Sequence, residues 1–595
     1  MRSTRRAVAL AVTVAFRADR WRSTAVIALS AIASVVGVLT AYWLKRIVDA
    51  AVAGDEGSAL AAAVGMAVTA GLGLAARAAT TRMQFPLKEN TGLYLDRQIV
   101  ALVSGVTTIE HHERPAYLDR LEVLRREMPD LGFAGMHTAG AVALLLQVGA
   151  TGALLVSVNP WLLAIPLFAV PSLWAEARAE RIRQEALDTT ADPSRRARHL
   201  FELATSPAAG KELRVFGAGA ELLRRHQKEW DDTDRVLDGA ARRGLGWTAA
   251  GWLVFSAGYA AAIALIAGQA VAGRASVGDV VLALALVAQV NGQVSMAAGA
   301  LTAVARMVKV ADRFLWLGDY AAASQRAADD PAPAPDRLVG GIELQGVGFR
   351  YPGTEVDVVS GLDLSLPAGA AVAVVGENGA GKSTLVKLLC RFYAPSAGVI
   401  SVDGIDLRRI DPCAWRTRMS AGFQDFTRFE LHAGQTVGVG DLPFLDDRVA
   451  VARALDRAAS GEVVSSLPDG LDTQLGASFD NGVELSGGQW QKLALARAMM
   501  RPAPLLLVLD EPTAALDAET EHKLFIRYAS MASAHAAQTG AITLLVSHRF
   551  STVRMADLIV VLDGGKIVGA GSHDELMAAG GLYADLYELQ AQAYR

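Results

Sequence analysis

Residues 376–384 read Gly-Glu-Asn-Gly-Ala-Gly-Lys-Ser-Thr, directly after the apolar run Ala371–Val375 and before a segment of helical composition. An uninterrupted apolar run of this length is typical of a buried strand, so the stretch lies at a strand-to-helix turn. Glycines at such a turn let backbone N–H groups approach phosphate oxygens, and the helix N-terminus favours anions. The spacing therefore predicts a nucleotide-phosphate site formed by Gly376, Glu377, Asn378, Gly379, Ala380, Gly381, Lys382, Ser383 and Thr384.

Two adjacent carboxylates, Asp510 and Glu511, follow a second apolar run, Leu505–Leu509. Nucleotides bind at the carboxyl ends of the strands in an α/β sheet, so we expect both side chains near the glycine-rich stretch. Asp510 and the Ser383 hydroxyl are suited to hold Mg²⁺, and Lys382 to reach the β and γ phosphates. Glu511 is suited to orient or deprotonate the attacking water of phosphoryl transfer. The sequence thus predicts ATP and Mg²⁺ as cofactors.

The N-terminal half contains five long stretches without Asp, Glu, Lys or Arg. About 20 apolar residues cross a bilayer as one helix, and the longest stretch has room for two crossings that turn at Asn159 and Pro160. Six membrane spans are therefore predicted. The stretches are Ser23–Leu44, Gly57–Ala76, Leu131–Ala175, Gly244–Gly273 and Val280–Ala305.

Basic residues predict the orientation of these spans. Six arginines precede residue 23, eight Lys or Arg lie in 77–130 and fourteen lie in 176–243, whereas the opposite side has only Lys45, Arg46 and Arg274. Cytoplasmic flanks carry the excess of Lys and Arg. We therefore expect a multi-pass protein of the cytoplasmic membrane, with its N-terminus and its C-terminal domain in the cytoplasm.

The composition changes at residues 321–340, which are polar and contain Pro331, Pro333 and Pro335. The fold class predicted is an all-α polytopic membrane domain of six helices with cytoplasmic extensions (1–320), a linker (321–340) and an α/β P-loop ATPase domain (341–595). A net charge of −4 provides no basic field, so no nucleic-acid partner is expected. The expected strands of a buried, largely parallel sheet are Ile342–Arg350, Ala371–Val375, Leu505–Leu509, Ile542–Val546 and Leu558–Leu562.

The stretch Leu-Ser-Gly-Gly-Gln at residues 485–489 resembles the signature of the ABC (ATP-binding cassette) ATPases. The resemblance extends over the whole C-terminal domain and implies catalytic roles for Lys382, Gln424, Glu511 and His548. By the same resemblance, Gln424 lies near Mg²⁺, His548 contacts the γ phosphate and Ala515–Asp517 form the D-loop. The residues implied to contact ATP outside the glycine-rich stretch are Tyr351, stacked on adenine, Gln424, Ser486, Gly487, Gly488 and Gln489.

Six spans ahead of a fused cassette resemble an exporter-type ABC half-transporter. This resemblance implies a dimer with a second half-transporter, identical or different, in which the signature of each subunit covers the γ phosphate bound by the other. It also assigns coupling helices to Glu110–Leu121 and Leu203–Phe216. One departure lies before the signature, where Phe479–Gly482 replaces the usual Gly-Glu-Arg-Gly, and the role of the Asp480–Asn481 loop stays open.

The transported molecule is not predicted by any motif. No charged residue lies in the central part of a span, and the polar residues there either line a cavity or hydrogen-bond between helices. An amphipathic drug, a peptide, a secondary metabolite or a lipid all remain open, with membrane lipid as a further partner. The alternative is an ATP-gated channel or a regulatory ABC membrane protein without cargo. The polar residues within the spans include Gln147, Gln289, Asn291 and Gln293.

Overall fold

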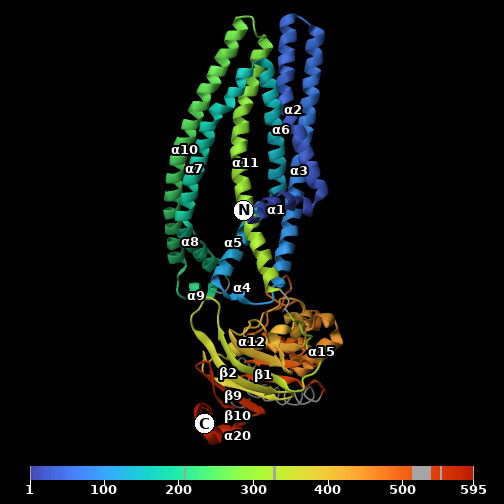
Figure 1. The fold of residues 1–595 in the computed structure, drawn as a ribbon, viewed down its shortest axis with the longest axis vertical. Coiled ribbons are helices and arrows are strands. Elements are labelled where there is room, and N and C mark those ends of the chain that lie inside the picture. The colour runs from blue at the N-terminus through green and yellow to red at the C-terminus, as the bar shows by residue number, and fades with distance from the viewer. Residues whose placement is uncertain are drawn as a thin grey trace. The chain divides into compact units, whose positions relative to one another are not determined.

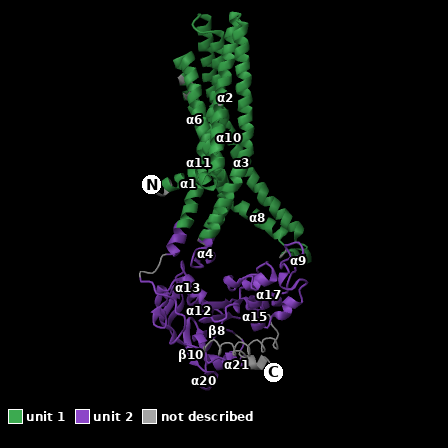
Figure 2. Cartoon of the chain, turned by 90° about the vertical axis from the view of Figure 1, so that its right-hand side faces the viewer, with its two compact units in different colours: residues 1–102, 120–318 green, residues 103–119, 319–595 purple. Residues whose placement is uncertain are grey.

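The computed structural model describes residues 2–206, 209–325, 330–511, 538–547, 549 and 553–593. The chain divides into two compact units (Figure 2). The first unit comprises residues 1–102 and 120–318, and the second comprises residues 103–119 and 319–595. A short segment, Val103–Asp119, therefore belongs to the same unit as the C-terminal domain, although 199 residues of the first unit follow it in sequence.

In its described residues, the first unit is built of helices (Figure 1). Six of its helical segments are long and apolar enough to cross a membrane, namely α2, α3, α6, η1 with α7, α10 and α11. They cover nearly all of each stretch expected from the sequence, so the prediction of six spans is confirmed. The helices of this unit are α1 (Arg2–Ala18), α2 (Arg20–Ala53), α3 (Glu56–Ser104), α5 (Pro115–Gly132), α6 (Ala134–Val158), η1 (Pro160–Ala164), α7 (Ile165–Thr189), α8 (Ala191–Thr205), α9 (Gly210–Val215), α10 (Gly219–Val271) and α11 (Val277–Ser324).

Local sequence explains where these helices end. The long apolar stretch is interrupted at Asn159, whose backbone is extended, as a residue before proline prefers. The Asn159 side chain accepts a hydrogen bond from the Trp161 backbone N–H (2.9 Å), which stabilises the turn. α7 and α10 both run well past their apolar segments, so the predicted helical extensions are also found.

Polar side chains inside the first unit join neighbouring helices. Gln293 on α11 donates to Thr151 on α6 (2.7 Å), and both residues are buried. Gln289, also on α11, donates to the Gly37 carbonyl of α2 (3.0 Å). The sequence left two roles open for these glutamines, lining a cavity or hydrogen bonding between helices. The structure shows hydrogen bonds between helices.

The second unit contains two sheets. A four-stranded antiparallel sheet has the order β2-β1-β4-β5, and a six-stranded sheet has the order β10-β9-β3-β8-β7-β6. In the larger sheet β9, β3, β8, β7 and β6 are parallel, and β10 pairs antiparallel with β9 at the edge. The strands are β1 (Gly341–Arg350), β2 (Asp357–Pro367), β3 (Ala371–Gly376), β4 (Ala397–Val402), β5 (Ile405–Asp406), β6 (Met419–Gly422), β7 (Leu506–Asp510), β8 (Ile542–Val546), β9 (Leu558–Asp563) and β10 (Lys566–Gly571).

One strand assignment was wrong. The run Ile342–Arg350 was expected in the parallel sheet, but β1 pairs antiparallel with both β2 and β4. An apolar run shows that a strand is buried and does not identify its partners, because those are chosen by the connections along the chain. The other four expected strands lie in the larger sheet, so the α/β class is confirmed.

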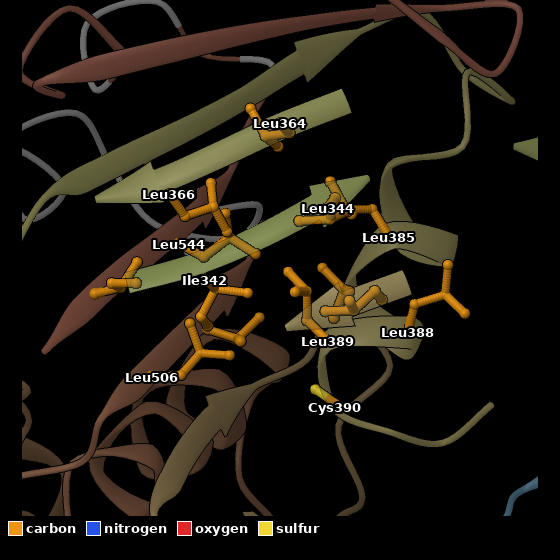
Figure 3. Packing of buried hydrophobic residues seen from close by; sticks show 14 of the residues in the cluster. Ile342, Leu344, Leu364, Leu366, Leu385, Leu388, Leu389, Cys390, Leu506 and Leu544 are labelled. Atoms are coloured by element: carbon orange, nitrogen blue, oxygen red, sulfur yellow. The ribbon is translucent and has the colours of Figure 1, made fainter. Parts of the chain in front are cut away.

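Buried aliphatic side chains from both sheets pack against α12 in one core (Figure 3). Ile342 of the antiparallel sheet, Leu506 of the parallel sheet and Leu389 of α12 are each fully buried there. This packing fixes the helix that follows the glycine-rich stretch. The helices with described residues in the second unit are α4 (Glu110–Glu113), α12 (Lys382–Leu389), η2 (Leu407–Arg409), α13 (Pro412–Thr417), α14 (Ala433–Gly438), η3 (Leu442–Phe444), α15 (Arg448–Arg457), α16 (Gly461–Ser465), η4 (Gly470–Asp472), α17 (Gly487–Ala498), α20 (His573–Ala579), α21 (Leu582–Ala593), the start of α5 and the ends of α3 and α11.

Candidate nucleotide-binding site

The glycine-rich stretch forms the turn between β3 and α12. Gly376 and Gly381 both have positive φ angles, +150° and +101°. A Cβ atom on Gly376 would lie 2.1 Å from the Leu562 carbonyl oxygen, so no other residue fits there without moving the neighbouring strand. Glycine at this position therefore lets the loop backbone pack closely against the neighbouring strand. Such a compact glycine-rich turn is what the sequence predicts for a phosphate-binding loop.

This turn borders an open pocket of about 560 Å³. The structure brings four of the predicted elements together around it: the glycine-rich loop, Gln424, Asp510 and Glu511. The lining residues are Val358, Asn378, Gly379, Gly381, Lys382, Ser383, Thr384, Gln424, Asp510, Glu511 and Val546.

Strand register explains why these distant residues meet. Asp510 of β7 is paired with Val546 of β8, so β8 separates the acidic residues from β3 and its loop. On the other side, Leu509 is paired with Gly422 of β6. Gln424 and Glu511 each lie two residues beyond that pair, and Gln424 Nε2 donates to Glu511 Oε2 (2.9 Å).

Lys382 points back into its own loop. Its Nζ donates to the Gly376 carbonyl (2.8 Å) and to the Glu377 carbonyl (2.9 Å). Burial lowers the pKa of Lys382, against the opposing charges of Glu511 and Asp510. The ammonium is thus held at two carbonyl groups of the loop whose amides would surround an anion.

Asp510 is the buried acid of the pocket. Burial raises its pKa to about 6, assisted by the negative charge of Glu511 and partly opposed by Lys382. A cation beside the carboxylate would offset this burial cost. Asp510, the Ser383 hydroxyl and the Gln424 amide oxygen line one pocket, and one carboxylate with neutral oxygens and phosphates is a donor set that suits Mg²⁺. The residues present therefore fit the predicted metal.

Glu511 is held in a strained conformation. Its φ of +47° lies in the left-handed region, which costs a non-glycine residue about 1–2 kcal/mol. Two contacts hold this backbone: the Glu511 N–H donates to the Val546 carbonyl (2.9 Å), and Gln491 Nε2 donates to the Glu511 carbonyl (3.4 Å). Such strain is typical of functional positions. Gln491 was not predicted, because no motif marks the residue two positions beyond the signature.

Tyr351 lies beside the start of α12. Its hydroxyl and that of Thr384 are 3.1 Å apart. The family resemblance implied that this ring contacts the nucleotide, and the structure places it next to the glycine-rich loop.

The signature residues lie elsewhere. Ser486 caps α17: its hydroxyl accepts from the Gln489 N–H, and the Gln489 side chain accepts from the Ser486 N–H. Ser486 and Gly487 are exposed, and within the described part of the chain residues 486–489 are not among those that line the pocket. His548 and Ala515–Asp517 fall outside the described residues.

Comparison with known proteins agrees with this geometry. Residues 359–514 match the family model described as ABC transporter. This part of the chain is therefore similar to ABC transporter domains. The whole chain has the fold of a bacterial Atm1-family ABC exporter solved with ATP bound, with a TM-score of 0.78, 23% identity and coverage of 96% of this chain and 99% of that one. The expected fold, a six-span membrane domain ahead of a cassette, is therefore confirmed, and the six candidate spans indicate a multi-pass membrane protein.

Curated relatives of the chain include proteins named ATP-dependent lipid A-core flippase. The one from Chromohalobacter salexigens is 41% identical over 264 residues, which is 44% of each chain. The one from Burkholderia orbicola is 42% identical over 253 residues, covering 42% of this chain and 40% of its own. The one from Bordetella avium is 36% identical over 333 residues, covering 56% and 54%. The chain thus spans about half the length of the curated relatives it matches.

Proposed function

We propose that this chain is one half of an ATP-driven exporter that moves an amphipathic molecule across the cytoplasmic membrane by alternating access. The observation that carries the proposal is the single pocket in which the glycine-rich loop, Gln424, Asp510 and Glu511 converge, in a chain with six membrane spans. ATP binding and hydrolysis at this pocket would drive the change in access.

Each pocket residue has a role in this proposal. The loop amides and Lys382 bind the phosphates, and Tyr351 stacks on adenine. Ser383, Gln424 and Asp510 would hold Mg²⁺, which when bound neutralises charge on the β and γ phosphates. Glu511 orients or deprotonates the attacking water. The hydrogen bond from Gln424 keeps the Glu511 carboxylate facing the pocket, and His548 completes the set at the γ phosphate.

A second half-transporter completes the site. Ser486 and Gly487 of the signature are exposed at the N-terminus of the twelve-residue helix α17, where backbone N–H groups and the helix dipole favour an anion. We assign Ser486, Gly487, Gly488 and Gln489 to the γ phosphate bound by the other subunit. This accounts for a signature that lies outside the pocket of its own chain. The second subunit is an identical or a related chain.

Lipid is the first class of cargo to test. The named relatives are flippases of a lipid, and a substrate of this kind agrees with spans whose centres carry no charge. The lipid would move from the cytoplasmic side outward, with the N-terminus and the ATPase domain in the cytoplasm. Peptides, drugs and secondary metabolites are the comparison classes.

The test is transport by the purified chain in proteoliposomes. Fluorescent phospholipids and lipid A analogues are placed in the membrane, Mg-ATP is added, and transfer between leaflets is measured by dithionite quenching. We expect ATP-dependent transfer that Glu511→Gln abolishes. ATP hydrolysis without transfer of any lipid would exclude lipid cargo, and absence of ATP hydrolysis would refute an exporter formed by two copies of this chain.

A further inference from the structure

The segment Val103–Asp119, which contains α4, is attached to the second unit at several points. Arg416 Nη2 donates to the Thr107 carbonyl (2.6 Å), and the Ile109 side chain packs against the core formed by both sheets and α12. Gln325 Nε2 also donates to the Gly105 carbonyl (2.7 Å). These contacts place α4 against the domain that holds the nucleotide pocket.

Glu113, at the end of α4, contacts two side chains close to that pocket. Its Oε1 accepts from Lys387 Nζ (2.6 Å), and its Oε2 accepts from the Tyr393 hydroxyl. Lys387 lies on α12, the helix that begins with Lys382, and Tyr393 follows the same helix. The Glu113 and Lys387 side chains are about a third exposed, 33% and 28%, so the pair is partly withdrawn from water. One carboxylate therefore holds two groups from the helix of the phosphate loop.

Both of these groups contact Tyr351. The Tyr393 and Tyr351 rings meet edge to face with centroids 5.5 Å apart, and Lys387 Nζ lies 5.3 Å from the Tyr351 centroid. Tyr351 in turn is within hydrogen-bond distance of Thr384 in the pocket wall. A continuous set of contacts thus runs from Glu113 to the ring proposed to stack on adenine.

We propose that Glu113 is a positioning residue for the nucleotide: through Lys387 and Tyr393 it holds the Tyr351 ring in the orientation that receives adenine. Affinity for ATP then depends on whether α4 is docked. Because such linkage is reciprocal, bound ATP also stabilises the docked position of α4, which lies in the chain between α3 and α5. The inference rests on the proposed function, since it assumes that this pocket binds ATP.

The proposal differs from a merely structural contact in one measurable way. A side chain that only supports the fold would affect all ligands of the pocket alike when it is lost. A residue acting on Tyr351 should affect ligands with a base and spare inorganic tripolyphosphate, which needs only the loop and the cation site. The ratio of the two affinities therefore reports the role of Glu113.

The experiment uses the full chain in lipid nanodiscs. Glu113→Gln keeps the size of the side chain and removes its charge, and Tyr393→Phe removes only the hydroxyl. The matched control is Glu110→Gln, because Glu110 lies on the same helix and pairs locally with Arg114 (2.5 Å), the residue that follows α4. The KM for ATP, kcat and the inhibition constant of Mg-tripolyphosphate are measured for each variant.

We expect Glu113→Gln to raise the KM for ATP about fivefold and Tyr393→Phe about twofold, with kcat retained and tripolyphosphate inhibition unchanged. Glu110→Gln should match the wild type. Exchange of the two charges, Glu113→Lys with Lys387→Glu, should recover part of the affinity. The inference is overturned if Glu113→Gln behaves like Glu110→Gln, or if tripolyphosphate and ATP weaken equally. If the wild type binds no ATP, the proposed function fails instead, so the two failures are distinguishable.

Discussion

Replacing Asp510 by asparagine should stabilise the ligand-free protein while it abolishes turnover. The side chain is only 8% exposed, and burial together with the charge of Glu511 raises its pKa to about 6 from the usual 3.8. The folded protein therefore disfavours the ionised form that predominates at neutral pH. Asparagine keeps the shape and removes the charge.

The size of the effect follows from the pKa. A rise from 3.8 to about 6 corresponds to at most about 3 kcal/mol of destabilisation at pH 7.5. Because the folded state binds the extra proton, wild-type stability falls as pH rises through the window between about 4 and about 6. At pH 5 the Asp510 carboxyl of the folded protein is largely protonated, so the destabilisation that its charge causes is only about 1.6 kcal/mol. The variant lacks this pH-dependent contribution.

Thermal unfolding in nanodiscs without nucleotide or divalent cation measures the difference. Asp510→Asn should raise the apparent midpoint by up to about 10 °C at pH 7.5 and by about half as much at pH 5. Asp425→Asn is the matched control, since Asp425 is exposed and contributes little to the pKa of Asp510. Mg-ATP should then stabilise the wild type more than the variant. A midpoint that falls, or a gain that is equal at both pH values, would refute the reasoning.

Three further predictions concern catalysis, topology and stability. Glu511→Gln should retain ATP binding and lower phosphate release by about 10²–10⁴-fold, and turnover within about tenfold of wild type would exclude a large role for the carboxylate. In a cysteine-free background, Gly273→Cys should react with an impermeant maleimide in intact cells and Ser324→Cys should not; the opposite pattern would invert the orientation. Asp279→Asn leaves Lys45 without its partly buried partner and should lower the unfolding midpoint by about 3 °C, restored by exchanging the two charges, whereas an unchanged midpoint would mean that the pair contributes nothing.

Much of the site could be predicted because its residues follow strand ends in the chain. Glu511 lies just beyond a predicted strand of the parallel sheet. Gln424 was implied by the family resemblance alone, because β6, whose end it follows, was not among the expected strands. The six spans were equally predictable, since length and composition alone determine whether a helix can cross a bilayer.

Contacts between residues that are far apart in the sequence and lie in no recognisable motif could not be predicted. Glu113 and Lys387 are 274 positions apart, and neither lies in a motif that points to the other. The antiparallel pairing of β1 was missed for a related reason: a buried strand has the same apolar pattern in either kind of sheet. The strained backbone of Glu511 is set by neighbouring strands and leaves no trace in composition.

The central claim is that ATP is hydrolysed at a site shared by two half-transporters, and complementation between two inactive variants tests it most directly. Ser486→Arg fills the space in front of the exposed signature, and Lys382→Ala removes the cation of the phosphate loop. Each variant alone should have no ATPase activity. When the two are co-expressed and the mixed dimer is isolated with two affinity tags, one of its sites combines an intact loop with an intact signature, so part of the activity should return. A purified mixed dimer without any activity would contradict a shared site whose two halves work independently.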